Sequence, residues 1–167
     1  MSGHRPSPLP GTPRTVADFR PFWPRTAMEA HGMELLEVDE NHAVVAMPVT
    51  DATRQPLGML HGGATMLLVE TAASVHACWG VDLAQRVPVG VEISGSHVRS
   101  CSGGRVRATA TVVRRTHSLI VHTVEVVHEE SGERLSSCRV TNFYKQTGSP
   151  PSPAEAKAAP VRRSPRC

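Results

Sequence analysis

The sequence predicts an α+β fold in which a curved antiparallel sheet is wrapped around one long central helix. One long apolar stretch, from about residue 61 to residue 80, is rich in Ala, Leu and Met and ends at a glycine. Runs of β-branched residues stand before and after it, separated by short polar or glycine-containing turns. A single helix among many strands favours a sheet that covers that helix. The 167 residues are enough for one domain with an ordinary core.

The N-terminal region is expected to start with a tail, residues 1–14, which is rich in Pro and Arg and lacks apolar periodicity. A short helical segment follows over residues 16–29 and is interrupted at Pro21 and Pro24. Three aromatic side chains in this segment can anchor it onto a core, and they are Phe19, Phe22 and Trp23.

Two short apolar runs precede the long helix. They cover residues 33–38 and 42–49, and the polar sequence DEN joins them. Runs of this length around a tight polar turn predict a β-hairpin.

The long helix is predicted over residues 61–80, because Gly80 closes it and helix-forming residues fill it. Its apolar residues lie on most sides, so we expect the helix to be largely enclosed. A glutamate at position 70 inside such a helix requires an explanation. The apolar residues are Met66, Leu67, Val69, Ala73 and Ala77.

Four further strands are predicted after the helix, at residues 87–98, 105–113, 118–129 and 134–144. The sequences SGG, RRTH and ESGE connect them, and such short polar or Gly-containing connections are typical of hairpin loops. These strands are therefore expected to form an antiparallel meander. Residues 146–167 predict a disordered C-terminal tail, which leaves residues 15–145 as the single domain.

The net charge of +3 arises at the two ends of the chain. Residues 146–167 carry +3 and residues 1–14 carry +2, so the stretch between them is slightly acidic. Neither a basic face nor a set of stacking aromatics is present, and we therefore expect no nucleic-acid partner. No apolar stretch has the length of a membrane span or a secretory signal, which predicts a cytoplasmic protein without a membrane partner.

Four scattered cysteines, with no CxxC pair, argue against a zinc site and against a disulfide framework. We interpret them as reduced thiols, mostly buried, and expect no metal. They are Cys78, Cys101, Cys138 and Cys167.

Chemically distinctive residues gather around the predicted start of the long helix. Two glycines there, Gly62 and Gly63, allow a ligand to approach the backbone closely, and the free amides of the first turn point outward with the positive end of the helix dipole. Such amides can hold a carbonyl oxygen while negative charge develops on it. His61 and Gln55 can reinforce them with side-chain groups.

Glu70 is the candidate nucleophile or general base. It lies eight residues after Gly62, about 12 Å further along a helix, so one chain cannot easily bring both groups to one carbonyl. Two antiparallel helices in a symmetric dimer would do so, and the site would then occur twice. Ser74, one turn after Glu70, can hold the attacking water or orient the carboxylate. Taken singly, His61 could also be a helix cap and Glu70 a paired structural acid.

The segment QPLGMLHGGATMLLVETAAS resembles the signature of the hotdog-fold thioesterases, particularly the branch that includes the aryl-CoA thioesterases. That signature is a Gln, then G-x-x-HGG, then a Glu nine residues after the His. The resemblance continues through VGVEISGSHVRS, GRVRA and LSSCRVTNF, and it covers about residues 30–145. The matching positions are Gln55, Gly58, His61, Gly62, Gly63 and Glu70.

The resemblance implies that Glu70 attacks the thioester carbon or activates a water, while the Gly62 amide and Gln55 polarise the carbonyl. It also implies that two segments line a coenzyme A channel, where arginines can meet the nucleotide phosphates. The alternative is that these arginines are solvated charges at strand ends. The implied substrate-binding residues are Gly63, Thr71, Gly90, His97, Val98, Arg99, Ser100, Arg114, Arg115, Thr116, His117 and Ser118.

The function implied is hydrolysis of an acyl-CoA to free acid and coenzyme A, with a hydroxybenzoyl, phenylacetyl or dihydroxynaphthoyl group favoured over an alkyl group. No cofactor is expected, since coenzyme A is part of the substrate. The resemblance further implies a homodimer that shares its active sites, assembled into a homotetramer.

Three alternatives stay open. One is a proofreading thioesterase that acts on a carrier protein, and another is a non-catalytic module that senses acyl-CoA. The sensor is disfavoured because it needs no carboxylate at position 70. A dehydratase of the same fold ranks below both. His76, His122 and His128 show no metal or triad spacing and are interpreted as structural or surface residues.

Overall fold

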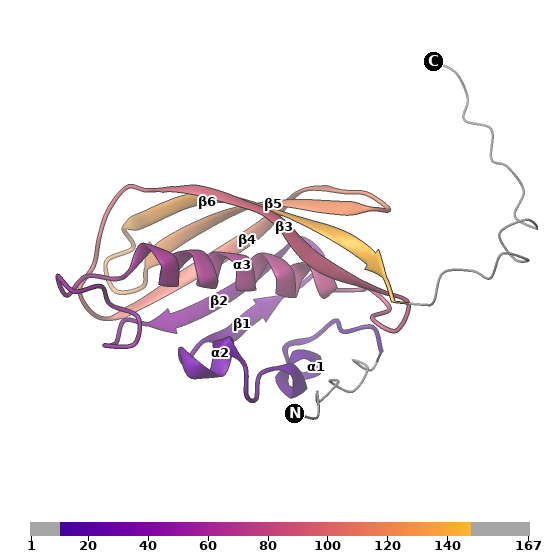
Figure 1. Cartoon of the computed structure of the whole chain (residues 1–167), viewed down its shortest axis with the longest axis horizontal. Coiled ribbons are helices and arrows are strands. Elements are labelled where there is room, and N and C mark those ends of the chain that lie inside the picture. The colour runs from indigo at the N-terminus through magenta and orange to yellow at the C-terminus, as the bar shows by residue number, and fades with distance from the viewer. Residues whose placement is uncertain (1–10, 148–167) are drawn as a thin grey trace, which may run out of the picture.

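The computed structural model describes residues 11–147 and shows six strands around one long helix (Figure 1). The α+β prediction is therefore confirmed. Three short helices begin the chain: α1 (Val16–Phe19), the 3-10 helix η1 (Arg20–Phe22) and α2 (Ala27–Ala30). Then follow β1 (Glu34–Val38), β2 (His42–Pro48), α3 (Gly62–Cys78), β3 (Arg86–His97), β4 (Arg105–Arg115), β5 (Leu119–His128) and β6 (Arg134–Gln146).

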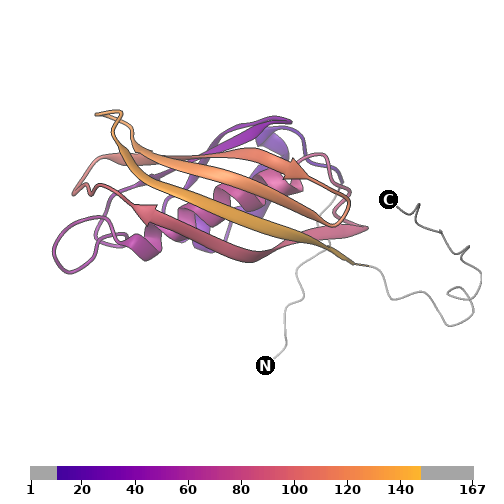
Figure 2. The ribbon, with the colours of Figure 1, turned by 90° about the horizontal axis from the view of Figure 1, so that it is seen from above.

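The six strands form one antiparallel sheet in the order β1-β2-β4-β5-β6-β3. The long helix α3 lies across one face of this sheet and contacts β2 to β6 (Figure 2). Successive side chains of a strand point to opposite faces of the sheet, so every second residue of the central strands packs against α3. In β4, for example, Val106, Ala108 and Ala110 are fully buried, while Thr109 between them is not.

The expected meander is wrong at one step, because β3 pairs with β6 and not with β4. The connection that contains SGG is a crossover that carries the chain from the β6 side of the sheet to β2. The Val98 N–H donates to Leu135 O in β6, and the Val49 N–H, just after β2, donates to Gly104 O. Turn chemistry is local, so it does not reveal which strand edge is free to accept the next strand.

The N-terminal segment packs where its aromatic residues anchor it. A capping box between Thr15 and Asp18 starts α1, and Phe19 at its end is only 2% exposed. The Trp23 indole N–H donates to Met33 O at 2.8 Å, and the Phe22 ring meets Phe19 edge to face. The predicted anchoring role of these aromatics is confirmed.

The two predicted tails lie largely outside the described residues, since residues 1–10 and 148–167 are not described. The part of the N-terminal tail that is described belongs to the domain. Gly80 N–H donates to Pro13 O at 2.8 Å, and the Trp79 indole donates to Arg14 O at 3.0 Å. Within residues 11–147, no helix is long and apolar enough to cross a membrane.

Strand β3 is a long, uncovered edge of the sheet. Every residue from Val89 to Ser100 is exposed, and the exposed apolar side chains within β3 are Val89, Val91 and Ile93. The opposite edge, β1, has only five residues. A long apolar edge strand in a single chain is typical of a surface that pairs with another strand.

Candidate active site

The start of α3 is capped by the histidine that the sequence singled out. His61 is the N-cap, and its Nδ1 accepts the Gly63 N–H at 2.8 Å. Because Nδ1 is the acceptor, the neutral ring carries its proton on Nε2. The Gly63 amide is therefore already satisfied within the chain, contrary to the expectation that both glycine amides are free. The Gly62 N–H, which finds no acceptor among residues 11–147, remains the available donor.

A second histidine lies directly against this helix start. A Cβ on Gly62 would lie 2.9 Å from His97 Nε2, so only glycine allows this approach. The His97 ring is held in place through Nδ1, which is 2.8 Å from the hydroxyl of buried Ser136. His97 and Gly62 line a cavity of about 220 Å³ together with Gln55, Arg99 and Ser100, so these predicted residues are brought together.

Gln55 is positioned by a tight loop between β2 and α3. Its side-chain oxygen accepts the Leu57 N–H, and its backbone N–H donates to Met59 O at 2.8 Å. This arrangement occupies the oxygen of the amide and leaves its NH₂ group to face a ligand. Arg99 forms a half-exposed ion pair with Glu133 at 3.0 Å.

Glu70 is exposed, although α3 is enclosed on most other sides. The expectation that an enclosed helix would bury it is therefore wrong in the single chain. Its carboxylate makes no hydrogen bond and no ion pair with any residue from 11 to 147. A structural acid would have such a partner, so the alternative of a paired structural acid is not supported.

The surroundings of Glu70 are built to admit its carboxylate. A Cβ on Gly90 of β3 would lie only 2.4 Å from Glu70 Oε1, so a larger residue here would displace the carboxylate. Thr71 and Ser74 line the same cavity of about 330 Å³ as Glu70. The Thr71 hydroxyl donates back to Leu67 O at 2.7 Å, so its oxygen can serve a substrate only as an acceptor.

Asn142 is a site residue that the sequence analysis missed. Its side-chain Nδ2 donates to Ser74 Oγ at 3.0 Å, and the same Nδ2 lies 3.9 Å from the Cβ position of Gly90. The residue is fully buried, and its Oδ1 has no hydrogen-bond partner in the described structure. The alternation in β6, which points Val140, Asn142 and Tyr144 inward, is the signal that could have identified it.

The two halves of the predicted site do not meet within one chain. Gly62 and Glu70 line different cavities, and no residue lines both. The helix between them is unbroken, so they are separated by about 12 Å along its axis. Within the described part of the chain, the carboxylate therefore has no electrophilic partner.

The predicted loop from Arg114 to Ser118 lies at the other end of α3, where β4 turns into β5. Arg115 donates there to the carbonyls of Trp79 and His76, at 3.2 and 3.5 Å, and so caps the end of the helix. The Thr116 hydroxyl closes the turn with Leu119. This loop does not join the His97 cavity within one chain, and Arg115 has a structural role.

Comparison with known proteins identifies relatives of one kind. A family model described as the thioesterase superfamily matches residues 57–134, the region that contains Gly62, Glu70 and His97. A 1,4-dihydroxy-2-naphthoyl-CoA hydrolase from Listeria monocytogenes is 35% identical over 118 residues, which are 71% of this chain and 94% of that protein. A proofreading thioesterase from Cronobacter turicensis is 34% identical over 116 residues, 70% of this chain and 83% of that protein.

The solved structures agree with these relatives. A mutant thioesterase from Pseudomonas aeruginosa superposes with a TM-score of 0.76 at 26% identity, and the match covers 84% of this chain and 99% of that one. A mutant of a hypothetical protein from Staphylococcus aureus gives a TM-score of 0.71 at 32% identity, with 72% and 99% covered.

Proposed function

The chain belongs to the thioesterase superfamily and is a thioester hydrolase, and we propose that it cleaves an acyl-coenzyme A into the free acid and coenzyme A. The observation that carries this proposal is the unpaired Glu70 carboxylate at the mouth of an apolar cavity. A carboxylate in that position is free to act on a reacting carbon, because no side chain among residues 11–147 neutralises it.

We propose further that each active site forms between two chains. Pairing of the exposed β3 edge with its copy, around a two-fold axis, would continue the sheet and set the two α3 helices antiparallel. Gly62 of the partner subunit would then approach Glu70, which compensates for their separation of about 12 Å within one helix. The same pairing would cover the exposed apolar residues Val91 and Ile93.

In this proposal the Gly62 N–H of the partner subunit and its Gln55 amide polarise the thioester carbonyl. Glu70 then either attacks the carbonyl carbon or takes a proton from a water that attacks it. With the activated water, the carbon–sulfur bond breaks and the proton that Glu70 took passes to the departing thiolate. With direct attack, coenzyme A leaves as the thiolate; a water then hydrolyses the acyl–Glu70 anhydride to the free acid, and its second proton goes to the thiolate as Glu70 returns to a carboxylate. Ser74, whose oxygen accepts from Asn142, keeps its own proton free to orient the water or the carboxylate.

The acyl group proposed is aroyl or related, such as a hydroxybenzoyl, phenylacetyl or dihydroxynaphthoyl group. The name of one relative, a 1,4-dihydroxy-2-naphthoyl-CoA hydrolase, supports this range. A cytoplasmic location, a homotetramer, catalysis without a cofactor and the absence of a nucleic-acid partner remain part of the proposal. An acyl carrier protein as substrate, or a sensor without activity, is the alternative.

The test is release of free thiol from a panel of benzoyl-, hydroxynaphthoyl-, phenylacetyl- and long-chain acyl-CoA. Glu70→Gln preserves the shape of the side chain and is expected to lower kcat by at least about 100-fold, with little change in substrate binding. Glu40→Gln, an exposed change in the β1–β2 turn, is the matched control and should leave turnover unchanged. Equal rates for Glu70→Gln and the parent would contradict the role of Glu70. Tight binding of acyl-CoA by the parent without hydrolysis would favour the sensor.

A further inference from the structure

A cavity of about 330 Å³ lies between the N-terminal segment and one face of α3, and Glu70 stands at its edge. Its size falls in the range of small-molecule sites in proteins. Most of its lining is apolar, and three aromatic rings contribute to it: Phe19, Phe22 and Trp23.

The helix supplies one wall of the cavity. Leu67, Thr71, Ser74 and Cys78 recur every three or four residues, so they lie along one stripe of α3. From Glu70 to Cys78 this wall runs for about 12 Å along the helix axis. A reacting carbonyl at Glu70 would therefore place the rest of an acyl group along this wall.

The opposite wall comes from the N-terminal segment and is held rigidly. Trp23 is fixed by its hydrogen bond to Met33 O at 2.8 Å, and the Thr26 hydroxyl donates back to Trp23 O. Phe22 packs edge to face on buried Phe19, with ring centroids 6.0 Å apart. The wall is thus formed before a ligand arrives, which reduces the entropy lost on binding.

The polar groups of the cavity are confined to the helix end that carries Glu70. The Ser74 hydroxyl lies one turn beyond Glu70, and the region farther along is lined by Phe22, Val75 and Cys78. Burial raises the pKa of the Cys78 thiol to about 12, so that the thiol is uncharged at neutral pH. A hydroxyl placed at this far end would meet only a weak sulfur partner.

We propose that this cavity binds the acyl group of the substrate and selects acyl groups whose far end is apolar, with Cys78 setting the length it accepts. This inference rests on the proposed thioesterase function and extends it to the class of acyl group. It favours an unsubstituted distal ring or a medium-length alkyl chain over a group that is hydroxylated at its far end.

Two substrate comparisons and a pair of variants test the proposal. Octanoyl-CoA and 8-hydroxyoctanoyl-CoA differ only in a hydroxyl at the far end of the chain, and kcat/KM is expected to be about tenfold higher for octanoyl-CoA. Cys78→Phe should shorten the cavity and lower the ratio of kcat/KM for octanoyl-CoA over acetyl-CoA by about tenfold or more. Cys78→Ala should raise the same ratio. Val113→Phe adds the same ring on the exposed face of β4 and should leave the ratio unchanged.

A second readout does not depend on turnover. In a Trp79→Phe background, Trp23 is the remaining tryptophan and lies in the cavity wall, so binding of naphthoyl-CoA should quench its fluorescence. Adding Glu70→Gln to this background should leave the quenching unchanged. Adding Cys78→Phe should weaken it.

The outcomes separate the two proposals. Hydrolysis with unchanged ratios in both Cys78 variants, or no preference for octanoyl-CoA over 8-hydroxyoctanoyl-CoA, would overturn the acyl cavity and leave the proposed function intact. Quenching that Cys78→Phe weakens, without hydrolysis by the parent, would support the cavity and contradict the proposed function. If Cys78→Phe does not fold, Cys78→Ala and the quenching decide the matter.

Discussion

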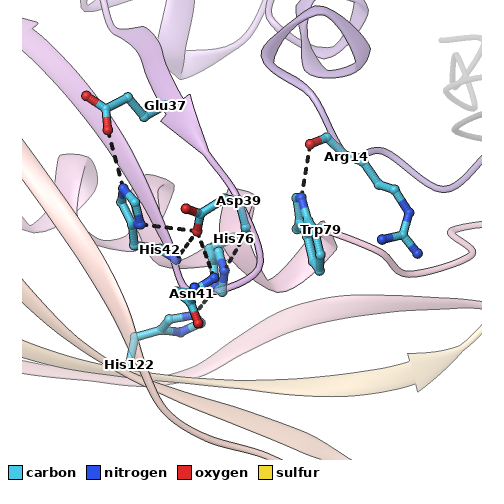
Figure 3. Close-up of polar contacts among 8 residues, drawn as sticks. All are labelled: Arg14, Glu37, Asp39, Asn41, His42, His76, Trp79 and His122. Atoms are coloured by element: carbon cyan, nitrogen blue, oxygen red, sulfur yellow. Dashed lines mark hydrogen bonds and ion pairs between the residues drawn. The ribbon is translucent and has the colours of Figure 1, made fainter.

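His76 and His122 form a hydrogen-bonded pair in the core, with His76 Nδ1 2.8 Å from His122 Nε2 and the two rings at 88° to each other (Figure 3). Both rings are fully buried. His76 Nε2 faces the carbonyl of Asp39 at 3.1 Å, so it must carry a proton. His76 Nδ1 is then the acceptor and His122 Nε2 the donor. His122 Nδ1 is left bare and has no partner in the described structure.

This pair predicts acid sensitivity of the fold. Burial lowers the pKa of His76 from 6.5 to about 4, helped by the nearby Arg115, and burial together with His76 and Arg115 lowers the pKa of His122 to about 3. Below pH 6.5 these two imidazoles are protonated in the unfolded chain but stay neutral in the folded chain, so stability is lost as the pH falls. The free energy of unfolding should drop by about 2 kcal/mol for each imidazole between pH 7 and pH 5.

Urea unfolding at several pH values measures this loss. His122→Gln retains an N–H donor toward His76 and cannot titrate, so the contribution of the pair should be about halved. The control is His31→Gln, a change outside the core at the end of α2. An equal pH dependence in His122→Gln and the parent would show that the pair does not resist protonation.

Gly90 is predicted to be required for activity more than for folding. Gly90→Ala places a Cβ 2.4 Å from Glu70 Oε1 and must displace the carboxylate. A displacement of this kind is expected to lower kcat by about 100-fold. Gly103→Ala, whose Cβ would have no atom within 4 Å, is the matched control. Full activity in Gly90→Ala would mean that the carboxylate does not react from the position described.

Ser74 and Asn142 are predicted to act as a unit. Ser74→Ala and Asn142→Leu each remove the hydrogen bond between them and should each lower kcat by about tenfold, with little change in KM. Because both changes remove one interaction, the double variant should lose no more than either single variant. Additive losses in this double-mutant cycle would show that Asn142 does not work through Ser74. Thermal unfolding checks that the core tolerates Asn142→Leu.

Strand β3 is predicted to be the contact through which the chain dimerises. Val91→Lys, at a side chain that is 59% exposed, should halve the mass measured by light scattering and lower activity by at least about 100-fold. Val113→Lys introduces the same charge at a side chain that is 54% exposed on β4, and it should change neither.

Mixing two inactive variants adds a check on the shared site. A dimer of one Glu70→Gln chain and one Gly62→Val chain carries one fully intact site, so random mixing should restore about a quarter of the parental sites. If the subunits exchange but no activity returns, Glu70 and Gly62 must act within the same chain.

Local patterns predicted most elements of the fold from the sequence. The helix and all strands lie within about two residues of their predicted bounds, because the periodicity of apolar residues reflects local geometry. The pairing of β3 with β6 could not be predicted in this way, since loop composition does not define strand neighbours. Glu70 was predicted in the correct helix, but it was expected to be buried and is exposed. Periodicity does not tell which part of a helix the sheet leaves uncovered.

The candidate site was predicted in part. Gln55, Gly62 and His97 do gather in one cavity, and Glu70 and Ser74 gather in another. The sequence did not identify Asn142, nor the pairing of His76 with His122, because both depend on contacts between residues far apart in the chain.

The unbroken helix between Gly62 and Glu70 makes the chain intolerant of any change in length there. One inserted residue would turn Glu70 by about 100° and advance it by about 1.5 Å. Since Arg115 holds the far end of α3, the shift could not be absorbed beyond that end. Insertions and deletions in residues 62–70 should therefore be strongly selected against, even at positions where several side chains would fit.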